Sequence, residues 1–473
     1  MPGIPMRGPV PSSAVDFGSV RTEFELVEDF PAAALAEAKA AVDRCAEGRE
    51  DRRDIEFVTI DPPGAKDLDQ AVHIAAEGEG YHVHYAIADV GALVVPGGAL
   101  EAETRERGQT LYLPDGSVPL HPRPLSEGAG SLLPEQDRAA ALWEIHLDAA
   151  GEVVSATVRR AVVRSRAQLD YAGVQADFDA GRVHPSIALL PKVGMLRAAW
   201  GRAHGAIDLR LPAQEAVQGP DGWTVRIEPR TDFDAHNAQI SLLTGVCAAA
   251  IMLEAGVGLL RTLPVAPDDA VADLRRTAAS LGQDWPKGVT VGDFLAGLDV
   301  STPQGLAVMS DAARLLRGSG YAAFGTAQAP EPPADRGHAG VGAPYAHVTA
   351  PLRRLADRYA TEVCLAACAG TPVPAWATDA LDDVAETMRR TNTVANKVDR
   401  ACIDLTEAVI LADRVGERFS AVTMRADQVL IDEPAVIAPC TGAPPEGSRV
   451  TVRLETADVT SRKVSFAYEK ALA

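Results

Sequence analysis

Features that mark membrane and exported proteins, and cysteine spacings typical of zinc sites, are missing from this 473-residue sequence. It contains no apolar run of 18 residues, so we expect that no segment spans a membrane. Residues 1–8 lack the apolar core of a signal peptide, and a cytoplasmic location is therefore expected. The six cysteines are scattered, and Cys364 and Cys368 have no His or Cys partner at a zinc-like spacing. Buried, reduced thiols are the predicted state of these side chains.

Positive charge is also scarce. The chain has 45 Lys and Arg against 65 Asp and Glu, a net charge of −20, whereas phosphate binding usually depends on Lys and Arg. Net charge does not exclude a local basic channel, however. We expect an acidic exterior around such a channel, because acidic residues are dense between 23 and 51 while basic residues gather in two late predicted helices. These basic residues are Arg353, Arg354, Arg358, Arg389, Arg390, Lys397 and Arg400.

The sequence does contain a group of aspartates next to a predicted strand. Residues 55–60 are apolar and β-branched, which predicts a buried strand, and the Pro-Pro-Gly turn at 62–64 ends it. Asp61 closes the strand, and Asp67 and Asp69 face the same way in an extended segment. Grouped carboxylates repel one another unless a cation lies among them, and Mg²⁺ prefers oxygen ligands. Spacing alone leaves two interpretations open, a metal site and a solvated acidic turn.

Motifs along the chain resemble those of one enzyme family. The aspartate segment, T-I-D-x5-D-x-D-x-A at residues 59–71, is followed by a second predicted strand with V-H-Y-A-I-A-D-V at residues 83–90. Together they resemble the catalytic block of the ribonuclease II family, the RNB exoribonucleases. The resemblance covers roughly residues 50–410. Further stretches similar to family segments follow in the family's order: Pro119–Arg138, Ser165–Tyr171, Ile227–Arg230 and Tyr345–Asp357.

This resemblance implies an α+β fold in three parts. Residues 1–50 are expected to form a short leader with one Ala-rich helix at 31–47. Residues 51–415 would form the RNB catalytic domain, a mixed β-sheet core with surrounding helices. Residues 416–473 would form a small OB-type β-barrel, and their alternation of apolar and polar residues predicts four or five strands. Family members usually carry two cold-shock-type barrels before the catalytic domain, so we expect a short form that lacks them.

A second motif surrounds Arg353. Pro351, preceded by Thr349 as N-cap, predicts a helix start whose free N–H groups attract an anion. Arg353 would add a planar, permanently charged fork to a phosphate. From the residues alone, Arg353 and Arg354 are better interpreted as surface arginines that pair with acids such as Asp357. The resemblance favours the phosphate role, because the family's transition-state arginine falls on Arg353.

The resemblance also implies a set of RNA-binding residues. Tyr171 corresponds to an aromatic residue that stacks on a base near the 3′ end, with a core tyrosine as the alternative. The polar face of a helix predicted at 379–413 would form a wall of the RNA channel, with a solvated face as the alternative. His73, His82 and His84 are interpreted as packing or surface residues. The other predicted RNA-binding residues are Tyr345, Thr349, Arg354, Arg389, Asn392, Asn396 and Arg400.

Two positions depart from the family pattern. The family has a fourth aspartate, a metal ligand, where Gln70 stands. Glutamine offers a carbonyl oxygen but no charge, so affinity for one ion should be lower. The family also commonly has a glutamate where Asn396 stands, which helps to hold the 3′-terminal nucleotide, so this end contact is expected to differ.

The function implied by the resemblance is a Mg²⁺-dependent 3′-to-5′ exoribonuclease that hydrolyses single-stranded RNA to nucleoside 5′-monophosphates. Two Mg²⁺ ions, or Mn²⁺ in their place, would be held by Asp61, Asp67 and Asp69 with Gln70 assisting. Asp69 and Arg353 would be the catalytic residues. Single-stranded RNA 3′ ends are the expected partner, and nothing indicates a membrane or an obligate protein partner. The alternative is a catalytically weak RNB-type protein that binds RNA 3′ ends or another protein. A phosphodiesterase for small nucleotides is disfavoured by the predicted barrel.

Overall fold

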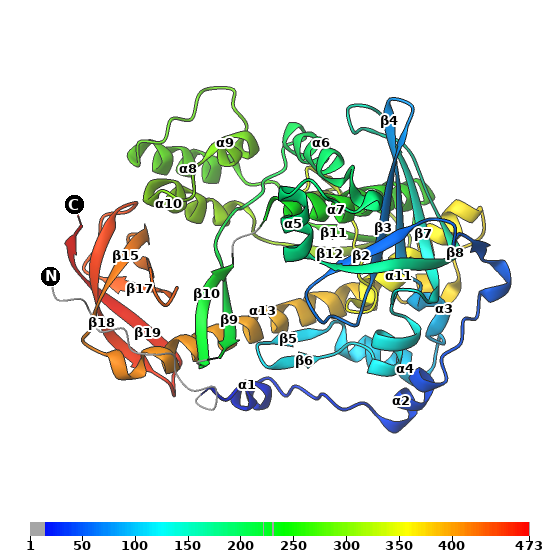
Figure 1. The fold of residues 1–473 in the computed structure, drawn as a ribbon, viewed down its shortest axis with the longest axis horizontal. Coiled ribbons are helices and arrows are strands. Elements are labelled where there is room, and N and C mark those ends of the chain that lie inside the picture. Colours follow the sequence, from blue (N-terminus) through cyan, green and yellow to red (C-terminus); the bar gives the residue numbers. More distant parts are fainter. Residues whose placement is uncertain (1–14, 221, 229–230, 473) are drawn as a thin grey trace.

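The computed structural model describes residues 15–220, 222–228 and 231–472. A mixed β-sheet with its surrounding helices lies at one end, and a closed barrel lies at the other (Figure 1). Helix α13 (Leu381–Leu411) runs between them and contacts strands of the barrel. Its 31 residues span about 46 Å at about 1.5 Å per residue. The α+β fold with a C-terminal barrel is thus confirmed.

The sheet places the aspartate segment. Its strand order is β1-β8-β2-β3-β4-β7, and β7 also pairs with β8, so β8, β2, β3, β4 and β7 form a closed circuit. Strands β2 and β8 are parallel, and the other pairs in this circuit are antiparallel. The long strand β8 pairs with β7 over its first part and with β2 over its last. The strands are β1 (Glu50–Asp51), β2 (Phe57–Asp61), β3 (Gln70–Glu77), β4 (Gly80–Ala88), β7 (Asp137–Leu147) and β8 (Val153–Asp170).

Helix α7 (Asp232–Ala255) covers one face of this sheet. By length and composition alone it is long and apolar enough to cross a membrane, although the sequence has no apolar run of 18 residues. In the structure it packs on α6 (Leu190–Ala203) and α11 (Leu355–Ala369). Its side chains Phe233, Leu243 and Met252 are buried in the main core with apolar residues of the sheet. These contacts account for its apolar composition, because burial of apolar surface is the main driving force for packing.

The N-terminal helix is shorter than predicted. Helix α2 spans Ala32–Lys39, not residues 31–47, and a short 3₁₀ turn at Ala46–Gly48 follows separately. Between them Arg44 donates hydrogen bonds to the carbonyl oxygens of Gly91 and Val94 at 2.7 and 3.0 Å. These contacts to a distant segment hold residues 40–45 outside the helix. Residues 1–8, on which the expected location was based, lie outside the described residues.

A hairpin and a helical lobe connect the sheet to the barrel. Strands β9 (Ala213–Gly219) and β10 (Gly222–Glu228) pair antiparallel and pack on α13. This agrees with the strand expected near residues 221–227, although Asp221, Pro229 and Arg230 lie outside the described residues. The helical lobe has a small core of its own, and its last helix contacts the barrel. It consists of α8 (Asp268–Ser280), α9 (Val291–Gly297) and α10 (Pro303–Ala312).

The C-terminal barrel closes in the order β15-β16-β17-β19-β18. Its core contains Phe419, Val452 and Phe466, and Val225 of the hairpin belongs to the same apolar cluster. The backbone N–H of Ala435 also donates to the Val225 carbonyl oxygen at 3.1 Å. The barrel is therefore docked on the hairpin. Its strands are β15 (Arg418–Arg425), β16 (Gln428–Ile431), β17 (Ile437–Thr441), β18 (Arg449–Asp458) and β19 (Lys463–Ala471).

Short elements complete the chain. Cys364 is buried in α11 as predicted, whereas Cys368, one turn later, is exposed. The helices not yet named are α1 (Gly18–Glu23), α3 (Val90–Leu93), α4 (Ala99–Arg107), α5 (Tyr171–Asp179) and α12 (Ala375–Thr378). The remaining strands are β5 (Leu111–Leu113), β6 (Gly116–Val118), β11 (Gly258–Thr262), β12 (Gly320–Phe324), β13 (Gly337–His338) and β14 (Ala343–Pro344).

Candidate active site

Strands β2 and β8 bring Asp61 and Tyr171 to the same edge of the sheet. Their parallel register pairs Asp61 with Asp170, and Tyr171 is the next residue. Asp170 caps helix α5, accepting a hydrogen bond from the Gly173 N–H at 2.8 Å, so Tyr171 begins the helix. Burial raises the pKa of Tyr171, and the nearby Asp61 carboxylate acts in the same direction. Tyr171 thus lies beside the predicted metal site.

Ser131 holds the loop that carries Asp67 and Asp69. Its hydroxyl accepts from the Leu68 N–H at 3.0 Å and donates to the Lys66 carbonyl oxygen at 2.6 Å. The Leu68 side chain is buried, which fixes the loop between the two aspartates. Ser131 lies in the family-like segment Pro119–Arg138, where this role was not predicted. A lone serine after a glycine carries no signal that could have predicted it.

Asp69 joins the aspartate segment to the motif around Arg353. Its side chain is 3% exposed and accepts a hydrogen bond from the Leu352 N–H at 2.7 Å. The Arg353 Nε lies 3.3 Å from the other Asp69 oxygen. Burial raises the pKa of Asp69 to about 7, and the Arg353 charge acts against this rise. The two predicted catalytic residues are therefore in contact.

The aspartates can accept a hard cation. Burial raises the pKa of Asp61 to about 6, and Asp61 Oδ2 is buried without a hydrogen-bond partner. Asp67 is half-buried at the same loop. A buried, unpartnered carboxylate oxygen is unfavourable unless a cation or donor reaches it. Oxygen donors of this kind fit Mg²⁺ or Mn²⁺.

The three aspartates do not form a closed ligand cluster. Among the residues that the structure describes, groups with three ligand atoms within 4.8 Å of one another lie elsewhere. Those groups are Glu77 with His82 and His146, and His82 with His84 and Glu144. The fit of the aspartates to a metal therefore rests on burial and on the unpartnered Asp61 oxygen.

Gln70 has a different environment from the one expected of a free ligand. Its carbonyl oxygen accepts a hydrogen bond from the Tyr85 hydroxyl at 2.5 Å, and its amide donates to the Thr349 carbonyl oxygen at 2.7 Å. The Ser241 hydroxyl lies 3.5 Å from the same Gln70 oxygen. Gln70 thus ties β3 to β4, α7 and the segment before Arg353. Its role as a metal ligand stays a prediction.

The predicted helix start at Pro351 is wrong. Helix α11 begins at Leu355, and Thr349 does not cap it. Asp357 accepts from the Ala350 N–H at 2.7 Å, which closes a turn before the helix. This turn presents the Leu352 N–H to Asp69. The sequence predicted free N–H groups that attract an anion here, and the anion that this N–H binds is the Asp69 carboxylate of the chain itself.

Arg353 and Arg354, adjacent in sequence, have separate roles. Arg354 makes two bonds with Asp357, at 2.9 and 2.8 Å, as the alternative interpretation of this motif expected. The Arg353 side chain is 46% exposed and so remains accessible beside Asp69. His121 supports this segment, since its Nδ1 lies 2.9 Å from the Leu352 carbonyl oxygen. Arg353 is the one of the two that can meet a phosphate.

Tyr112 is an aromatic residue near the site that sequence analysis missed. It lies in β5 and is 56% exposed. Burial of its hydroxyl raises the pKa of Tyr112, and the charges of Arg353, Asp67 and Asp69 also act on that hydroxyl. Its ring is therefore accessible beside the predicted catalytic residues. The sequence offered no signal, because the bridge between Gln109 and Arg354 that brings β5 here joins distant segments.

The other predicted RNA-binding residues differ in accessibility. Tyr345 and Thr349 are buried, and the Tyr345 ring packs edge-on against His338 and His347. On α13, Asn392 is half-buried. The residues of this α13 face that are exposed are Arg389, Asn396 and Arg400.

Carboxylates pair with most of the arginines that were expected to form the basic channel. Arg358 is buried, and its Nη1 lies 3.0 Å from Glu101 Oε1. Arg400 Nη2 lies 2.6 Å from Asp404 Oδ1. Arg390 lies 3.7 Å from Glu106. The channel expected from the basic residues of the two helices therefore carries less free positive charge than predicted.

Two cavities lie away from the aspartates. One, of about 280 Å³, lies between α6, α7 and α9 and is lined by Arg197, Arg202 and Arg210. The other, of about 690 Å³, includes Cys45 and Cys368. Neither contains a predicted catalytic residue in its lining. The candidate site is therefore recognised by its chemistry and not by the size of a cavity.

Family models match both parts of the chain. The RNB domain model matches residues 49–368, and the model of the RNase II-type exonuclease C-terminal S1 domain matches residues 417–469. The chain therefore belongs to the RNB family.

Curated relatives and solved structures agree with this assignment. Ribonuclease R of Escherichia coli K12 is 30% identical over 66% of this chain and 39% of its own length. Exosome complex exonuclease RRP44 homolog A of Arabidopsis thaliana is 26% identical over 82% of this chain and 43% of its own. The chain thus spans less than half the length of these relatives.

The fold also matches solved structures at low identity. Mycoplasma genitalium RNase R in complex with ribose methylated single-stranded RNA matches with a TM-score of 0.83 and 17% identity, over 96% of this chain and 77% of that one. Yeast Ssd1, a pseudonuclease, matches with a TM-score of 0.67 and 15% identity, over 89% of this chain and 53% of that one. These likenesses concern the fold alone.

Proposed function

We propose that the chain is a metal-dependent 3′-to-5′ exoribonuclease that hydrolyses single-stranded RNA to nucleoside 5′-monophosphates. The observation that carries this proposal is the contact between Asp69 and Arg353, at 3.3 Å, beside a buried and unpartnered oxygen of Asp61. Membership of the RNB family and the likeness to proteins named Ribonuclease R support it. RNA 3′ ends are the proposed partner, and the cytoplasm is the proposed location.

Asp61, Asp67 and Asp69 would hold Mg²⁺, or Mn²⁺ in its place. When bound, two such ions supply an activated water and charge stabilisation for the leaving 3′ oxygen. Asp61 and Asp69 are largely kept from water, and this burial makes their ionised carboxylates unfavourable unless a cation is bound. The chain thereby prepares the site for a cation. The hydrogen bonds of Ser131 fix the intervening loop, so the carboxylates need little rearrangement when a cation arrives.

Arg353 would neutralise charge on the scissile phosphate. Its guanidinium already lies next to Asp69 and is accessible to a ligand. A phosphate oxygen would add a charge-assisted hydrogen bond, which is strongest where water is excluded. Arg354 is less suited to this role, because Asp357 occupies its guanidinium through two bonds.

Aromatic and polar side chains would hold the RNA strand. Tyr171 and Tyr112 flank the predicted catalytic residues and offer rings for base stacking, which tolerates any base. The α13 face with Asn392 and Asn396 offers groups for contacts to the sugar and its 2′-OH. The barrel would contribute a further nucleic-acid surface, as OB-type barrels commonly do.

A second candidate is an RNB protein that binds RNA without cleaving it. Gln70 favours this candidate, since it replaces an expected charged ligand and its amide is engaged with Tyr85 and Thr349. The retained aspartates and Arg353 favour catalysis. The two candidates differ in a single measurable property, the release of mononucleotides.

The first experiment is a nuclease assay on 5′-labelled single-stranded RNA with Mg²⁺ or with EDTA. The proposal expects shortening with Mg²⁺ and none with EDTA. Asp69→Asn keeps the shape of the side chain but removes its charge, so it should lower turnover by orders of magnitude while RNA binding survives. Asp177→Asn, at an exposed position of α5, is the matched control and should match the wild type. RNA binding without cleavage by the wild type would support the second candidate, and an Asp69→Asn rate near wild type would end the catalytic role of Asp69.

A further inference from the structure

A row of imidazole rings lies on the face of the sheet that points away from the main core. Side chains alternate between the two faces of a strand. The register places His73, His84 and Glu144 in one row across β3, β4 and β7, and His82 opposite His146 in the next. The alternate residues of these strands belong to the main core. None of these histidines is used by the proposed nuclease site.

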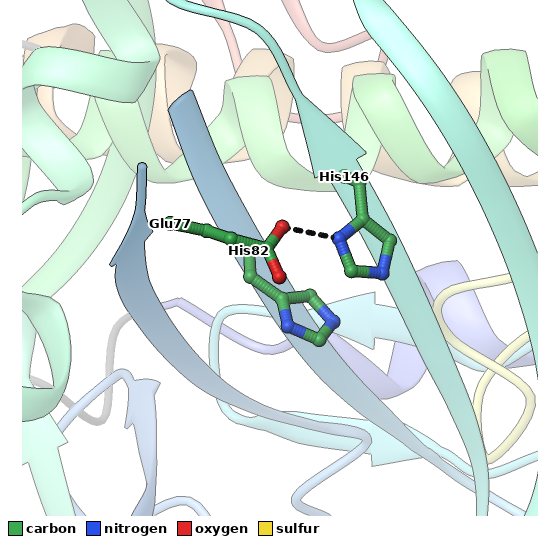
Figure 2. A group of neighbouring side chains, drawn as sticks. All are labelled: Glu77, His82 and His146. Atoms are coloured by element: carbon green, nitrogen blue, oxygen red, sulfur yellow. Dashed lines mark hydrogen bonds and ion pairs between the residues drawn. The ribbon is translucent and has the colours of Figure 1, made fainter. Parts of the chain in front are cut away.

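The rings are close together. The centroids of His82 and His146 are 3.9 Å apart in a stacked arrangement, and those of His82 and His84 are 3.8 Å apart. Glu77 is the last residue of β3, and its Oε2 lies 2.5 Å from His146 Nδ1 (Figure 2). Protonated rings would repel one another at these distances. A neutral imidazole keeps a lone pair on one ring nitrogen for a ligand bond.

Several ring nitrogens in this row have no partner. His82 Nε2, His84 Nδ1 and His73 Nδ1 are buried and make no hydrogen bond. His84 is itself 7% exposed. Native structures leave few buried polar atoms unsatisfied, and an unplaced ion is one explanation for such a group. Of these residues, His82 and His84 also belong to groups of three ligand atoms that could hold a metal ion.

Two groups of three ligand atoms come within 4.8 Å, and both contain His82. Charge decides between them. Glu144 already pairs with Arg52 at 2.7 Å and with Arg159, and two guanidinium groups disfavour a cation there. Glu77 bonds to His146 and has no arginine partner among the described residues. We propose that Glu77, His82 and His146 bind a transition-metal ion, with Zn²⁺ as the best-matched ion.

The ligand types support this choice. Two imidazoles and one carboxylate are a known zinc donor set, with an open fourth position for water. Tetrahedral Zn²⁺ with bonds of about 2.0–2.2 Å holds its ligand atoms about 3.4 Å apart. The side chains of Glu77 and His146 are 54% and 34% exposed, so they can adjust to this spacing by rotation. Mg²⁺ prefers oxygen ligands and would not compete for the imidazoles.

The proposed site would act on stability. Glu77, His82 and His146 come from three neighbouring strands, so one ion would join β3, β4 and β7 at the end next to the β3–β4 turn. Gln70 stands at the opposite end of β3, about 23 Å away at about 3.3 Å per residue. An ion bound only by the folded state raises the midpoint of thermal unfolding.

The test is zinc titration of the full chain, freed of any purification tag and treated with EDTA, in excess Mg²⁺. We expect one Zn²⁺ to bind with micromolar affinity or better and to raise the Tm by about 2–4 °C at saturation. Glu77→Gln and His146→Gln should each weaken binding at least about tenfold and remove the Tm shift, because each removes one ligand bond. Cobalt absorption in the visible range gives an independent signature of imidazole ligation.

Two control variants test whether zinc binds at other places on the chain. His204→Gln removes an exposed histidine from the end of α6 and should bind zinc as the wild type does. Asp69→Asn should also retain zinc binding, since the predicted catalytic site is elsewhere. Equal zinc affinity in the wild type, Glu77→Gln and His146→Gln would overturn the proposal. Absence of binding at micromolar zinc, or loss of binding only in Asp69→Asn, would also overturn it.

Discussion

Gln70 connects three segments through one side chain. Its amide joins the Tyr85 hydroxyl to the Thr349 carbonyl oxygen, and Thr349 lies four residues before Arg353. This arrangement needs both an acceptor and a donor. An aspartate, which the family pattern has at this position, could accept from Tyr85 but could not donate to Thr349. Glutamine therefore serves here as a structural link, whatever its effect on ion binding.

Gln70→Asp tests this link. The substitution leaves the Thr349 carbonyl oxygen without its donor and places a carboxylate near it. We expect the free energy of unfolding to fall by about 1–3 kcal/mol, the usual penalty for an unsatisfied buried polar group. If position 70 is a metal ligand, the added charge should also lower the Mg²⁺ concentration for half-maximal cleavage. Denaturant unfolding and a Mg²⁺ titration of the rate provide the two measurements, and an unchanged Mg²⁺ requirement would show that position 70 lies outside the ligand shell.

Tyr112→Ala tests the aromatic residue that the structure adds to the site. Removal of the exposed ring should weaken RNA binding by about 1–3 kcal/mol, the value of one base–aromatic stack, which is about 5- to 150-fold in Kd. Tyr112→Phe keeps the ring and should bind nearly as the wild type does. Fluorescence anisotropy with labelled RNA and no Mg²⁺ measures the affinities. If the phenylalanine variant were as weak as the alanine variant, the hydroxyl and not the ring would be the contact.

At the scale of elements, Glu407 of α13 joins the helix to the hairpin and the barrel. Its carboxylate accepts from Gln214 Nε2 at 2.7 Å and lies 3.4 Å from the Ile437 N–H of β17. The same Gln214 amide group reaches the Ala435 carbonyl oxygen at 2.8 Å. Glu407 is 2% exposed, and burial raises its pKa to about 7 from 4.5. The junction of the two parts of the molecule therefore contains a titrating group.

Glu407→Gln should flatten the pH dependence of stability. The folded state holds the Glu407 proton more tightly than the unfolded state, so this residue stabilises the fold below pH 4.5. That contribution is lost as the pH rises through about 7. We expect the wild type to lose about 2–3 kcal/mol relative to Glu407→Gln between pH 4.5 and 8. Denaturant unfolding of both proteins at several pH values measures the difference, and parallel curves would contradict the raised pKa.

Local patterns predicted most elements, and distant contacts explain the exceptions. The apolar run at residues 55–60 correctly indicated β2, and the alternation of apolar and polar residues correctly indicated β4 and the strands of the barrel, because burial of strand faces follows directly from the sequence. The helix start at Pro351 was predicted wrongly, because Asp357 closes a turn there with the Ala350 N–H. The partner of Arg358 was also not predictable, since Glu101 is distant in the sequence, whereas Asp404 lies one helical turn from Arg400. The candidate site was visible from its motifs, whereas Ser131 and Tyr112 were not.

At the scale of the whole molecule, the acidic charge and the paired arginines limit what electrostatics can do. With a net charge of −20 and most late-helix arginines bound to carboxylates, long-range attraction of RNA is weak. Recognition must then come from close contacts at the site. Two of the carboxylates are recessed, because Asp69 is 3% exposed and Asp61 Oδ2 is buried, while Arg353 beside them is accessible. A strand end can reach such carboxylates more easily than the middle of a strand.

The burial of these carboxylates also bears on the proposed choice of substrate. We expect 5′-labelled RNA to be shortened stepwise from its 3′ end, and circular RNA of the same sequence to remain intact because it offers no end. DNA of the same sequence should bind but resist cleavage, since it lacks the 2′-OH that we propose Asn392 and Asn396 to contact. The assay follows product ladders on denaturing gels for all three substrates at equal concentration, with Asp69→Asn as the inactive control. Cleavage of the circle would show that the aspartates admit an internal phosphate, and equal cleavage of DNA would remove the role of the 2′-OH. Either result would contradict an exoribonuclease whose carboxylates are reached only by an RNA end.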